Sequence, residues 1–171
     1  MHSRIFLIGF MGSGKTTYGK KIARMMGYDF VDMDEMIVST EGMSISEIFR
    51  THGEEYFRDK EREAIGQAAK MNKVIIATGG GAPCYGKNME LLKEAGLTIY
   101  LKLEPKALLN RLKNAKGKRP LLAGKSPEEM LQTIEDMLSA REIFYNRADM
   151  IIDGLQGVSE RVVNAIQRRS E

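Results

Sequence analysis

Residues 9–16 constrain the fold of this chain most, and they read Gly-Phe-Met-Gly-Ser-Gly-Lys-Thr. They fit the pattern G-x-x-x-x-G-K-[ST], a glycine loop that joins a strand to a helix and binds phosphates. The flanks agree, because residues 4–8 are an apolar run typical of a buried strand and the residues from Lys15 onward are typical of a helix. Backbone N–H groups of the loop and the positive end of the helix would then face the phosphates. We expect Lys15 to reach the β- and γ-phosphates and the Thr16 hydroxyl to bind Mg²⁺.

The rest of the chain alternates predicted strands with predicted helices. Strands are expected at residues 4–8, 28–32, 74–78, 97–103 and 150–152, and helices at 15–27, 33–40, 44–51, 54–71, 87–95, 105–114, 126–146 and 159–169. This alternation predicts an α/β fold of three αβα layers, in which helices cover both faces of a five-stranded parallel sheet. Ligands of such sheets bind at the carboxyl ends of the strands. Since Gly9, Asp32 and Gly79 all follow predicted strands, we expect them to meet in one crevice.

The length and composition bound the class of protein. A chain of 171 residues, 43% hydrophobic and 29% charged, predicts one soluble domain over residues 1–171. Within it, residues 34–62 form an insertion between the second and third strands, and residues 112–125 have the composition of a mobile lid. No apolar run approaches the 18 residues or so of a membrane span, and we see no signal peptide.

Charge and cysteine content point to the compartment and the partners. The net charge of +3 is too weak to indicate a nucleic-acid partner. The single cysteine, Cys84, cannot form an internal disulfide, which fits a reducing cytoplasm, and we interpret it as a small apolar filler. We expect a cytoplasmic monomer with no nucleic-acid or membrane partner, because a P-loop enzyme of this size needs no second chain to complete its site.

Asp32 and Asp34 form an acidic pair one strand beyond the P-loop. At the period of a strand both carboxylates would point the same way. Asp32 with Thr16 would provide a hard-oxygen site for Mg²⁺, and Asp34 could accept a proton from a substrate hydroxyl. The alternative is a pair of solvated acids at a strand end, which becomes the poorer interpretation once the P-loop precedes them.

Three consecutive glycines, Gly79, Gly80 and Gly81, follow the predicted strand at 74–78. Such a run is costly in backbone entropy, so it makes sense where the backbone approaches a ligand and donates N–H groups. A plain loop is the alternative.

Several arginines are candidates for binding anionic groups. Arg58 lies three residues before Glu61 on a helix face, and Arg141 lies near the end of a long helix. Arginine binds carboxylates bidentately, although each of these side chains could equally be a surface ion-pair partner. Arg111 and Arg119 are candidates for the lid, and Arg119 could stabilise charge on a transferred phosphoryl group. From the residues alone we infer a small NTP-dependent phosphotransferase whose acceptor is not named.

In its motifs the chain resembles the shikimate kinase family over nearly its whole length. The matching features are Gly-Phe-Met-Gly-Ser-Gly-Lys-Thr-Thr at 9–17, Asp32-Met33-Asp34, Phe57-Arg58 with Glu61, Thr78-Gly79-Gly80-Gly81, Arg119-Pro120-Leu121-Leu122, and Arg141 with Tyr145. The resemblance implies ATP-dependent phosphorylation of the 3-hydroxyl of shikimate in aromatic amino-acid biosynthesis. It also implies a nucleoside-monophosphate-kinase-like fold with a substrate-binding insertion and a closing lid.

The resemblance further implies roles for individual residues. ATP would be bound by Gly12, Ser13, Gly14, Lys15, Thr16, Thr17, Arg111 and Arg119, with Mg²⁺ on Thr16 and Asp32. Shikimate would be bound by Asp34, Arg58, Gly79, Gly80, Gly81 and Arg141. Lys15, Asp34 and Arg119 would be catalytic, and Asp34 would be the base. The loop from Asp153 to Ser159 resembles the family's adenine loop, although it lacks the proline often found there.

Three rival interpretations remain at this point. A gluconate kinase would share the P-loop and the acceptor chemistry but would bind a linear acid. An adenylate kinase would show a cysteine-bearing lid and a second nucleotide site, neither of which we see. A nucleotide-dependent regulator or nucleic-acid binder would bind ATP without releasing ADP to any hydroxy acid, and its DNA or RNA binding would depend steeply on salt.

Overall fold

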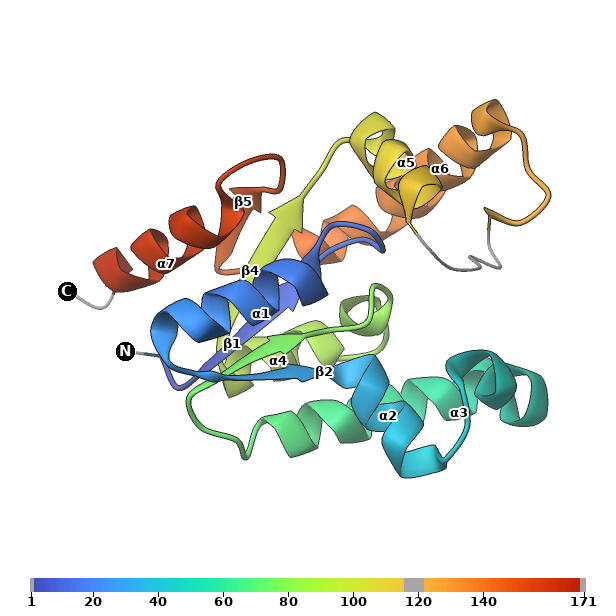
Figure 1. Cartoon of the computed structure of the whole chain (residues 1–171). Coiled ribbons are helices and arrows are strands. Elements are labelled where there is room, and N and C mark those ends of the chain that lie inside the picture. The colour runs from blue at the N-terminus through green and yellow to red at the C-terminus, as the bar shows by residue number, and fades with distance from the viewer. Residues whose placement is uncertain (1, 116–121, 170–171) are drawn as a thin grey trace.

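The computed structural model describes residues 2–115 and 122–169, and its centre is a parallel β-sheet (Figure 1). The strands are β1 (Arg4–Ile8), β2 (Asp29–Asp32), β3 (Val74–Ala77), β4 (Leu97–Lys102) and β5 (Met150–Asp153). The helices are α1 (Lys15–Met26), α2 (Met33–Glu41), α3 (Ile45–Ala68), the short 3₁₀ turn η1 (Ala82–Cys84), α4 (Asn88–Ala95), α5 (Pro105–Asn114), α6 (Pro127–Tyr145) and α7 (Val158–Arg169). Every strand pair is parallel and the order is β2-β3-β1-β4-β5. The predicted five-stranded α/β fold is confirmed.

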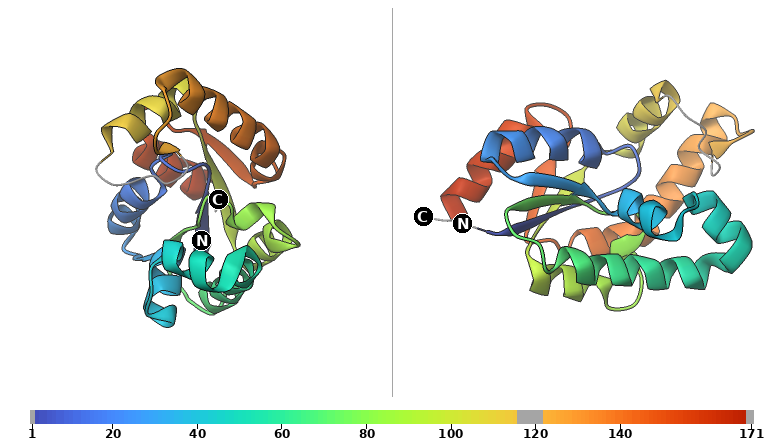
Figure 2. Two further views of the ribbon diagram at one scale, coloured as in Figure 1. Left: turned by 90° about the vertical axis from the view of Figure 1, so that its right-hand side faces the viewer. Right: turned by 60° about the horizontal axis from the view of Figure 1, so that its bottom comes forward.

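Strand β1 shows how one apolar run serves two faces of the sheet. Ile5 and Leu7 pack into a core with residues of α1 and α7, whereas Phe6 and Ile8 pack into the core on the other face. Successive strand residues point to opposite faces, so a continuously apolar strand must be buried on both. Figure 2 shows the resulting layers, with α1 and α7 on one side of the sheet and α3 and α4 on the other.

Several helices begin and end where the sequence provides capping residues. Ser44 and Ser126 each form a capping box with the glutamate three positions later, Glu47 and Glu129. Gly27 ends α1 in the left-handed conformation, with φ of 67°. These local signals explain why most predicted boundaries lie within one or two residues of those observed.

The segment between β2 and β3 forms α2 and α3, which cover the predicted insertion at 34–62. Gly53 interrupts α3, because its φ of 85° and ψ of 176° are not helical. The break predicted there is therefore present, although the helical residues on its two sides count as one element. In Figure 1 the α2–α3 pair and the α5–α6 pair both project from the same end of the sheet as the glycine loop after β1.

Part of the predicted lid at 112–125 lies outside the described residues, namely 116–121, which include Arg119. The flanking residues are described, and Leu122 is buried against the core that contains α5 and α6. None of the helices in the described part of the chain is long and apolar enough to cross a membrane.

Candidate active site

The loop after β1 turns through glycines in the left-handed region. The φ angles are 144° at Gly9, 79° at Gly12 and 96° at Gly14, which residues with a Cβ rarely adopt. Lys15 begins α1, and its ammonium group donates hydrogen bonds to the carbonyl oxygens of Gly9 (2.7 Å) and Phe10 (2.9 Å). The lysine is only 8% exposed, so the loop wraps around a buried positive charge.

Asp32 connects the P-loop to α2 through hydrogen bonds of its carboxylate. Its Oδ2 accepts a 2.8 Å hydrogen bond from the Thr16 hydroxyl, and its Oδ1 accepts one of 2.9 Å from the Asp34 N–H, which caps α2. The predicted reason for the convergence of Asp32 and Asp34 is wrong, because Asp34 lies in the first turn of α2 and not on a strand. The two carboxylates are neighbours because one caps the helix that carries the other.

Asp34 lies among charged groups from three segments of the chain. Burial raises the pKa of its carboxyl group above the ordinary value, and the negative charge of Asp32 acts in the same direction. The positive charges of Lys15 and Arg58 oppose this increase in pKa. Asp34 therefore faces both the phosphate loop and the arginine on α3.

Thr16 and Asp32 provide the only oxygen pair that the sequence predicts for a metal ion. Within the described residues there is no cluster of three or more His, Cys, Asp and Glu side chains that could hold a metal ion. Mg²⁺ keeps most of its ligands as water and phosphate oxygens and needs one or two from the protein. The hydroxyl and carboxylate of this pair therefore fit Mg²⁺ bound together with a phosphate group.

A cleft of about 410 Å³ runs from the phosphate loop to the glycines after β3. It is lined by Met11, Gly12, Gly14, Lys15, Thr16, Thr17, Tyr18, Asp32, Asp34, Thr78, Gly80, Arg111 and Ala115. The expected meeting of three strand ends in one crevice is confirmed for the P-loop, Asp32 and the loop after β3. Ser13, a member of the P-loop, is fully buried, and neither Arg58 nor Arg141 is part of the described lining of the cleft.

The glycines at 79–81 lie directly against charged side chains, and Gly79 and Gly81 leave space that a Cβ would take from them. A Cβ on Gly79 would lie 2.9 Å from Asp34 Oδ1, and one on Gly81 would lie 2.9 Å from Arg58 Nη1. A Cβ on Gly80 would lie 3.4 Å from Arg141 Nη1. One acidic and two basic side chains therefore lie against three consecutive backbone positions.

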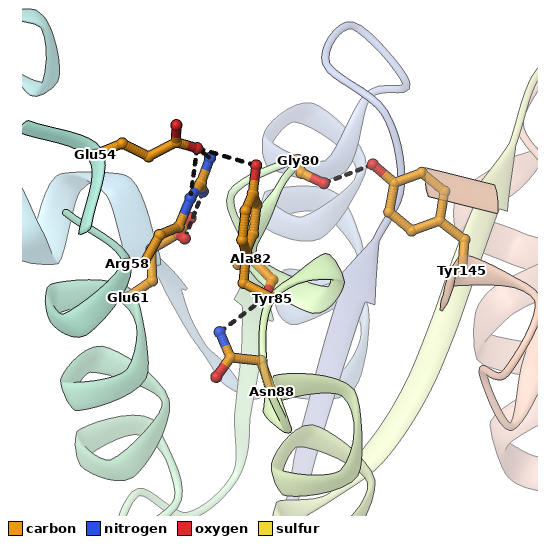
Figure 3. A network of polar contacts seen from close by, with 8 residues as sticks. All are labelled: Glu54, Arg58, Glu61, Gly80, Ala82, Tyr85, Asn88 and Tyr145. Atoms are coloured by element: carbon orange, nitrogen blue, oxygen red, sulfur yellow. Dashed lines mark hydrogen bonds and ion pairs between the residues drawn. The ribbon is translucent and has the colours of Figure 1, made fainter. Parts of the chain in front are cut away.

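The backbone of this loop is held by buried side chains on its far side. The Tyr145 hydroxyl donates a 2.5 Å hydrogen bond to the Gly80 carbonyl oxygen, and Asn88 Nδ2 donates one of 2.9 Å to the Ala82 carbonyl oxygen (Figure 3). Both side chains are almost fully buried. The orientation of the loop is therefore set by contacts with α4 and α6.

The sequence left open whether Arg58 is an exposed ion-pair partner. The structure shows instead that it is largely buried. Its side chain is 14% exposed, and Nη1 donates a 2.6 Å hydrogen bond to Glu61, whose side chain is only 2% exposed. Burial raises the pKa of Glu61, and the charge of Arg58 partly opposes this. Arg58 also pairs with Glu54 at 3.1 Å and lies against the ring of Tyr85.

Arg141 on α6 and Arg111 on α5 contact different loops of the site. The guanidinium carbon of Arg141 lies 5.7 Å from the centre of the Phe10 ring, next to Gly80. Arg111 donates to the carbonyl oxygens of Ser13 (3.1 Å) and Gly154 (2.6 Å), and so connects the P-loop with the loop after β5. This places Arg111 beside the loop that resembles the adenine loop of the family.

Cys84 follows the glycines but has the character of a partly buried core residue. It packs against the larger core, and burial raises the pKa of its thiol to about 11. At neutral pH the group is an uncharged thiol, which agrees with its interpretation as an apolar filler.

Three residues of this region were missed by sequence reasoning, namely Glu54, Tyr85 and Asn88. Glu54 could have been noticed as the acid four residues before Arg58, the spacing of neighbours on a helix. Tyr85 could have been noticed as an aromatic residue soon after a glycine run. Asn88 had no such signal, because its partner is a backbone carbonyl group.

Comparison with known proteins identifies the family. Residues 11–171 match the family described as shikimate kinase. A shikimate kinase from Parabacteroides distasonis is 41% identical over 163 residues, covering 95% of this chain and 94% of the relative.

Solved structures agree with this match. The shikimate kinase from Bacteroides thetaiotaomicron superposes with a TM-score of 0.92 at 37% identity and covers 99% of both chains. A shikimate kinase from Acinetobacter baumannii, solved in complex with shikimate, has a TM-score of 0.85 at 33% identity and covers 98% of this chain and 92% of its own. The chain therefore belongs to the shikimate kinase family, the enzymes that transfer a phosphoryl group from ATP to the 3-hydroxyl of shikimate in aromatic amino-acid biosynthesis.

Proposed function

We propose that the described residues divide the reaction between a donor site on the P-loop and an acceptor site on the glycines after β3. On the donor side, backbone N–H groups of residues 12–17 bind the phosphates of ATP, as expected at the start of a helix. Lys15 leaves the carbonyl oxygens of Gly9 and Phe10 to contact the transferred phosphoryl group. Arg111, which already lies between the P-loop and Gly154, contacts the nucleotide.

Thr16 and Asp32 would hold Mg²⁺ with the phosphates. Their 2.8 Å hydrogen bond supports this assignment, because it shows that both oxygens already face the same point. When bound, the ion would neutralise charge on the phosphate oxygens. Asp32 also keeps Asp34 in place through the helix cap, so the two carboxylates have separate tasks.

The convergence of Asp34, Arg58 and Arg141 on three adjacent glycines carries the assignment of the acceptor site. Two guanidinium groups on neighbouring positions suit a carboxylate, which arginine binds with paired hydrogen bonds. Asp34, one position earlier, suits a hydroxyl group of the same small molecule. Asp34 therefore accepts the proton of the 3-hydroxyl as the hydroxyl oxygen bonds to the γ-phosphorus of ATP, and the bond from that phosphorus to the departing ADP breaks. The lid and Arg119 remain predictions from the sequence.

Kinetics of the two arginine variants test the acceptor assignment. We expect Arg58→Ala and Arg141→Ala each to raise the KM for shikimate by about 10- to 150-fold, the effect of losing roughly 1.5–3 kcal/mol of charge-assisted hydrogen bonding. The KM for ATP should stay within about twofold of the parent value. Arg62→Ala is the matched control, because Arg62 lies on the same helix, is exposed and pairs with Asp59.

The same assay should be repeated with the methyl ester of shikimate, which lacks the negative charge. We expect the preference for the acid over the ester to shrink in both variants and to be unchanged in Arg62→Ala. A normal KM for shikimate in both variants would remove the carboxylate assignment.

A further inference from the structure

The guanidinium group of Arg58 lies on the aromatic ring of Tyr85, a residue of the segment after β3 that also carries Gly79, Gly80 and Gly81. Its central carbon is 3.7 Å from the centre of the Tyr85 ring, a distance typical of direct stacking. Phe57 is the next ring, at 5.2 Å. Figure 3 shows Tyr85 beside Arg58, between α3 and the loop that carries Gly80.

Glu54 connects the ring to the guanidinium group. Its Oε1 accepts a 3.0 Å hydrogen bond from the Tyr85 hydroxyl and one of 3.1 Å from Arg58 Nη2. These two hydrogen bonds lower the pKa of Glu54, so the group is a carboxylate at neutral pH. Arg58, Glu54 and Tyr85 therefore form a closed triangle, which we call the Arg58 triangle.

The Arg58 triangle leaves the arginine little freedom. Glu61 fixes Nη1 from inside the protein, Glu54 fixes Nη2 and Nε from the solvent side, and the ring of Tyr85 fixes the plane of the group. A free arginine side chain loses about 2 kcal/mol of rotamer entropy when it is immobilised. An arginine that is already held in position does not incur this loss when a carboxylate binds.

We propose that Tyr85 is a positioning residue for the carboxylate of the acceptor, and that it acts by fixing the plane in which Arg58 presents its N–H groups. This inference rests on the proposed role of Arg58. Gly81 and Tyr85 belong to the same loop, so the segment that leaves room for the guanidinium group also supplies the surface on which it lies. Glu54 holds the ring and the guanidinium group in a fixed relative position through its hydrogen bonds to both.

The chain contains a second triangle of the same kind that serves as a matched control. On α3, the Tyr56 hydroxyl donates a 2.7 Å hydrogen bond to Glu41, and Lys60 lies 3.3 Å from Glu41 and 5.2 Å from the Tyr56 ring. Its members also join a tyrosine, a cation and a glutamate. None of them is among the atoms that would lie nearest to a Cβ on Gly79, Gly80 or Gly81.

The experiment measures kcat and KM for shikimate, for its methyl ester and for ATP in Tyr85→Ala, Tyr85→Phe and Tyr56→Ala. We expect Tyr85→Ala to raise the KM for shikimate by roughly 3- to 30-fold, the range given by loss of a cation–π contact. Its kcat and its KM for ATP should stay within about twofold, and the KM for the ester should not change. Tyr85→Phe keeps the ring and should show a smaller increase in KM. Tyr56→Ala should show none.

The outcomes separate this inference from the assignment on which it rests. If Arg58→Ala lowers the preference for the acid over the ester but Tyr85→Ala does not, the role of Tyr85 is wrong and that of Arg58 stands. If Arg58→Ala leaves the preference intact, the role of Arg58 fails. An equal increase in KM for the acid and for the ester in Tyr85→Ala would show that the ring only supports the fold. If Tyr85→Ala does not fold, Tyr85→Leu, which keeps apolar bulk without a π face, gives the same comparison.

Discussion

Two glycine segments line the active site, and they need glycine for different reasons. In the P-loop, Gly9, Gly12 and Gly14 have φ angles between 79° and 144°, so these residues are required by the backbone conformation. Gly79, Gly80 and Gly81, all within the described residues, have no left-handed φ. At Gly79 and Gly81 a Cβ would lie 2.9 Å from Asp34 and Arg58, whereas a Cβ on Gly80 would make an ordinary contact of 3.4 Å with Arg141.

This difference separates two ways of building a site. The proposed donor site uses backbone groups of one contiguous segment, which would recognise phosphate through N–H groups and a helix end. The proposed acceptor site would use side chains from α2, α3 and α6, which meet on one short loop. A change in the donor loop should therefore weaken the binding of ATP, whereas a change around the acceptor loop should weaken the binding of shikimate alone.

The largest expected effect tests whether Asp34 belongs to the acceptor site. Asp34→Asn should lower kcat by about 10²- to 10⁴-fold, the usual contribution of a general base. Binding of an ATP analogue, measured by calorimetry, should stay within about threefold of the parent because the asparagine keeps the shape of the side chain. Loss of nucleotide binding together with turnover would assign Asp34 to the donor site instead.

Lys15→Met removes the buried positive charge of the donor loop. We expect kcat to fall by about 10²- to 10³-fold, as when one stabilising group of the transition state is lost. Shikimate binding in the absence of nucleotide should be nearly unchanged, because Lys15 donates hydrogen bonds to the carbonyl oxygens of Gly9 and Phe10 in the donor loop. Turnover close to that of the parent would contradict the donor assignment, and circular dichroism should confirm that the variant is folded.

The smallest effect concerns the charge buried behind the acceptor site. Because folding raises the pKa of Glu61 above the ordinary 4.5, the folded chain binds this proton more tightly than the unfolded chain. Its contribution to stability is therefore present below pH 4.5 and is lost as the pH rises through the raised pKa. Glu61→Gln removes this loss, so the free energy of unfolding of the variant relative to the parent should increase from pH 4 to neutral pH.

Urea unfolding of both proteins across this range measures the difference. The exposed Glu63→Gln is the control, since Glu63 pairs with Lys60 at the surface. A relative stability of Glu61→Gln that falls with rising pH would show that the ion pair with Arg58 outweighs the burial.

The structure of the P-loop could be predicted almost completely from the sequence because its residues are contiguous. The strand, the loop and the start of α1 at Lys15 agree with the prediction, and so do the residues that line the cleft there. The two capping boxes and Gly27 explain the good helix boundaries. The strand order was not predicted, because periodicity within a segment carries no information about its neighbours in the sheet.

The acceptor site could be predicted only in part. The closeness of Asp34 to Asp32 was predicted for the wrong reason, since a helix cap rather than the period of a strand brings the two together. The Arg58 triangle could not be predicted, because Tyr85 and Glu54 are 31 positions apart and meet only in the folded chain. The run Gly79–Gly81 was recognised as unusual, but the side chains that lie against it come from distant parts of the sequence and meet it only in the folded chain.

Titration of Gly81→Ala with shikimate, and separately with an ATP analogue, tests the separation of the two sites most directly. The new Cβ would lie 2.9 Å from Arg58 Nη1, the far end of a long side chain rather than backbone, so the fold should persist while Arg58 is displaced from the Arg58 triangle. We predict that the Kd for shikimate rises about tenfold or more, equivalent to about 1.4 kcal/mol, while the Kd for the ATP analogue does not change. Unchanged binding of shikimate, or an equal loss for both ligands, would contradict the account.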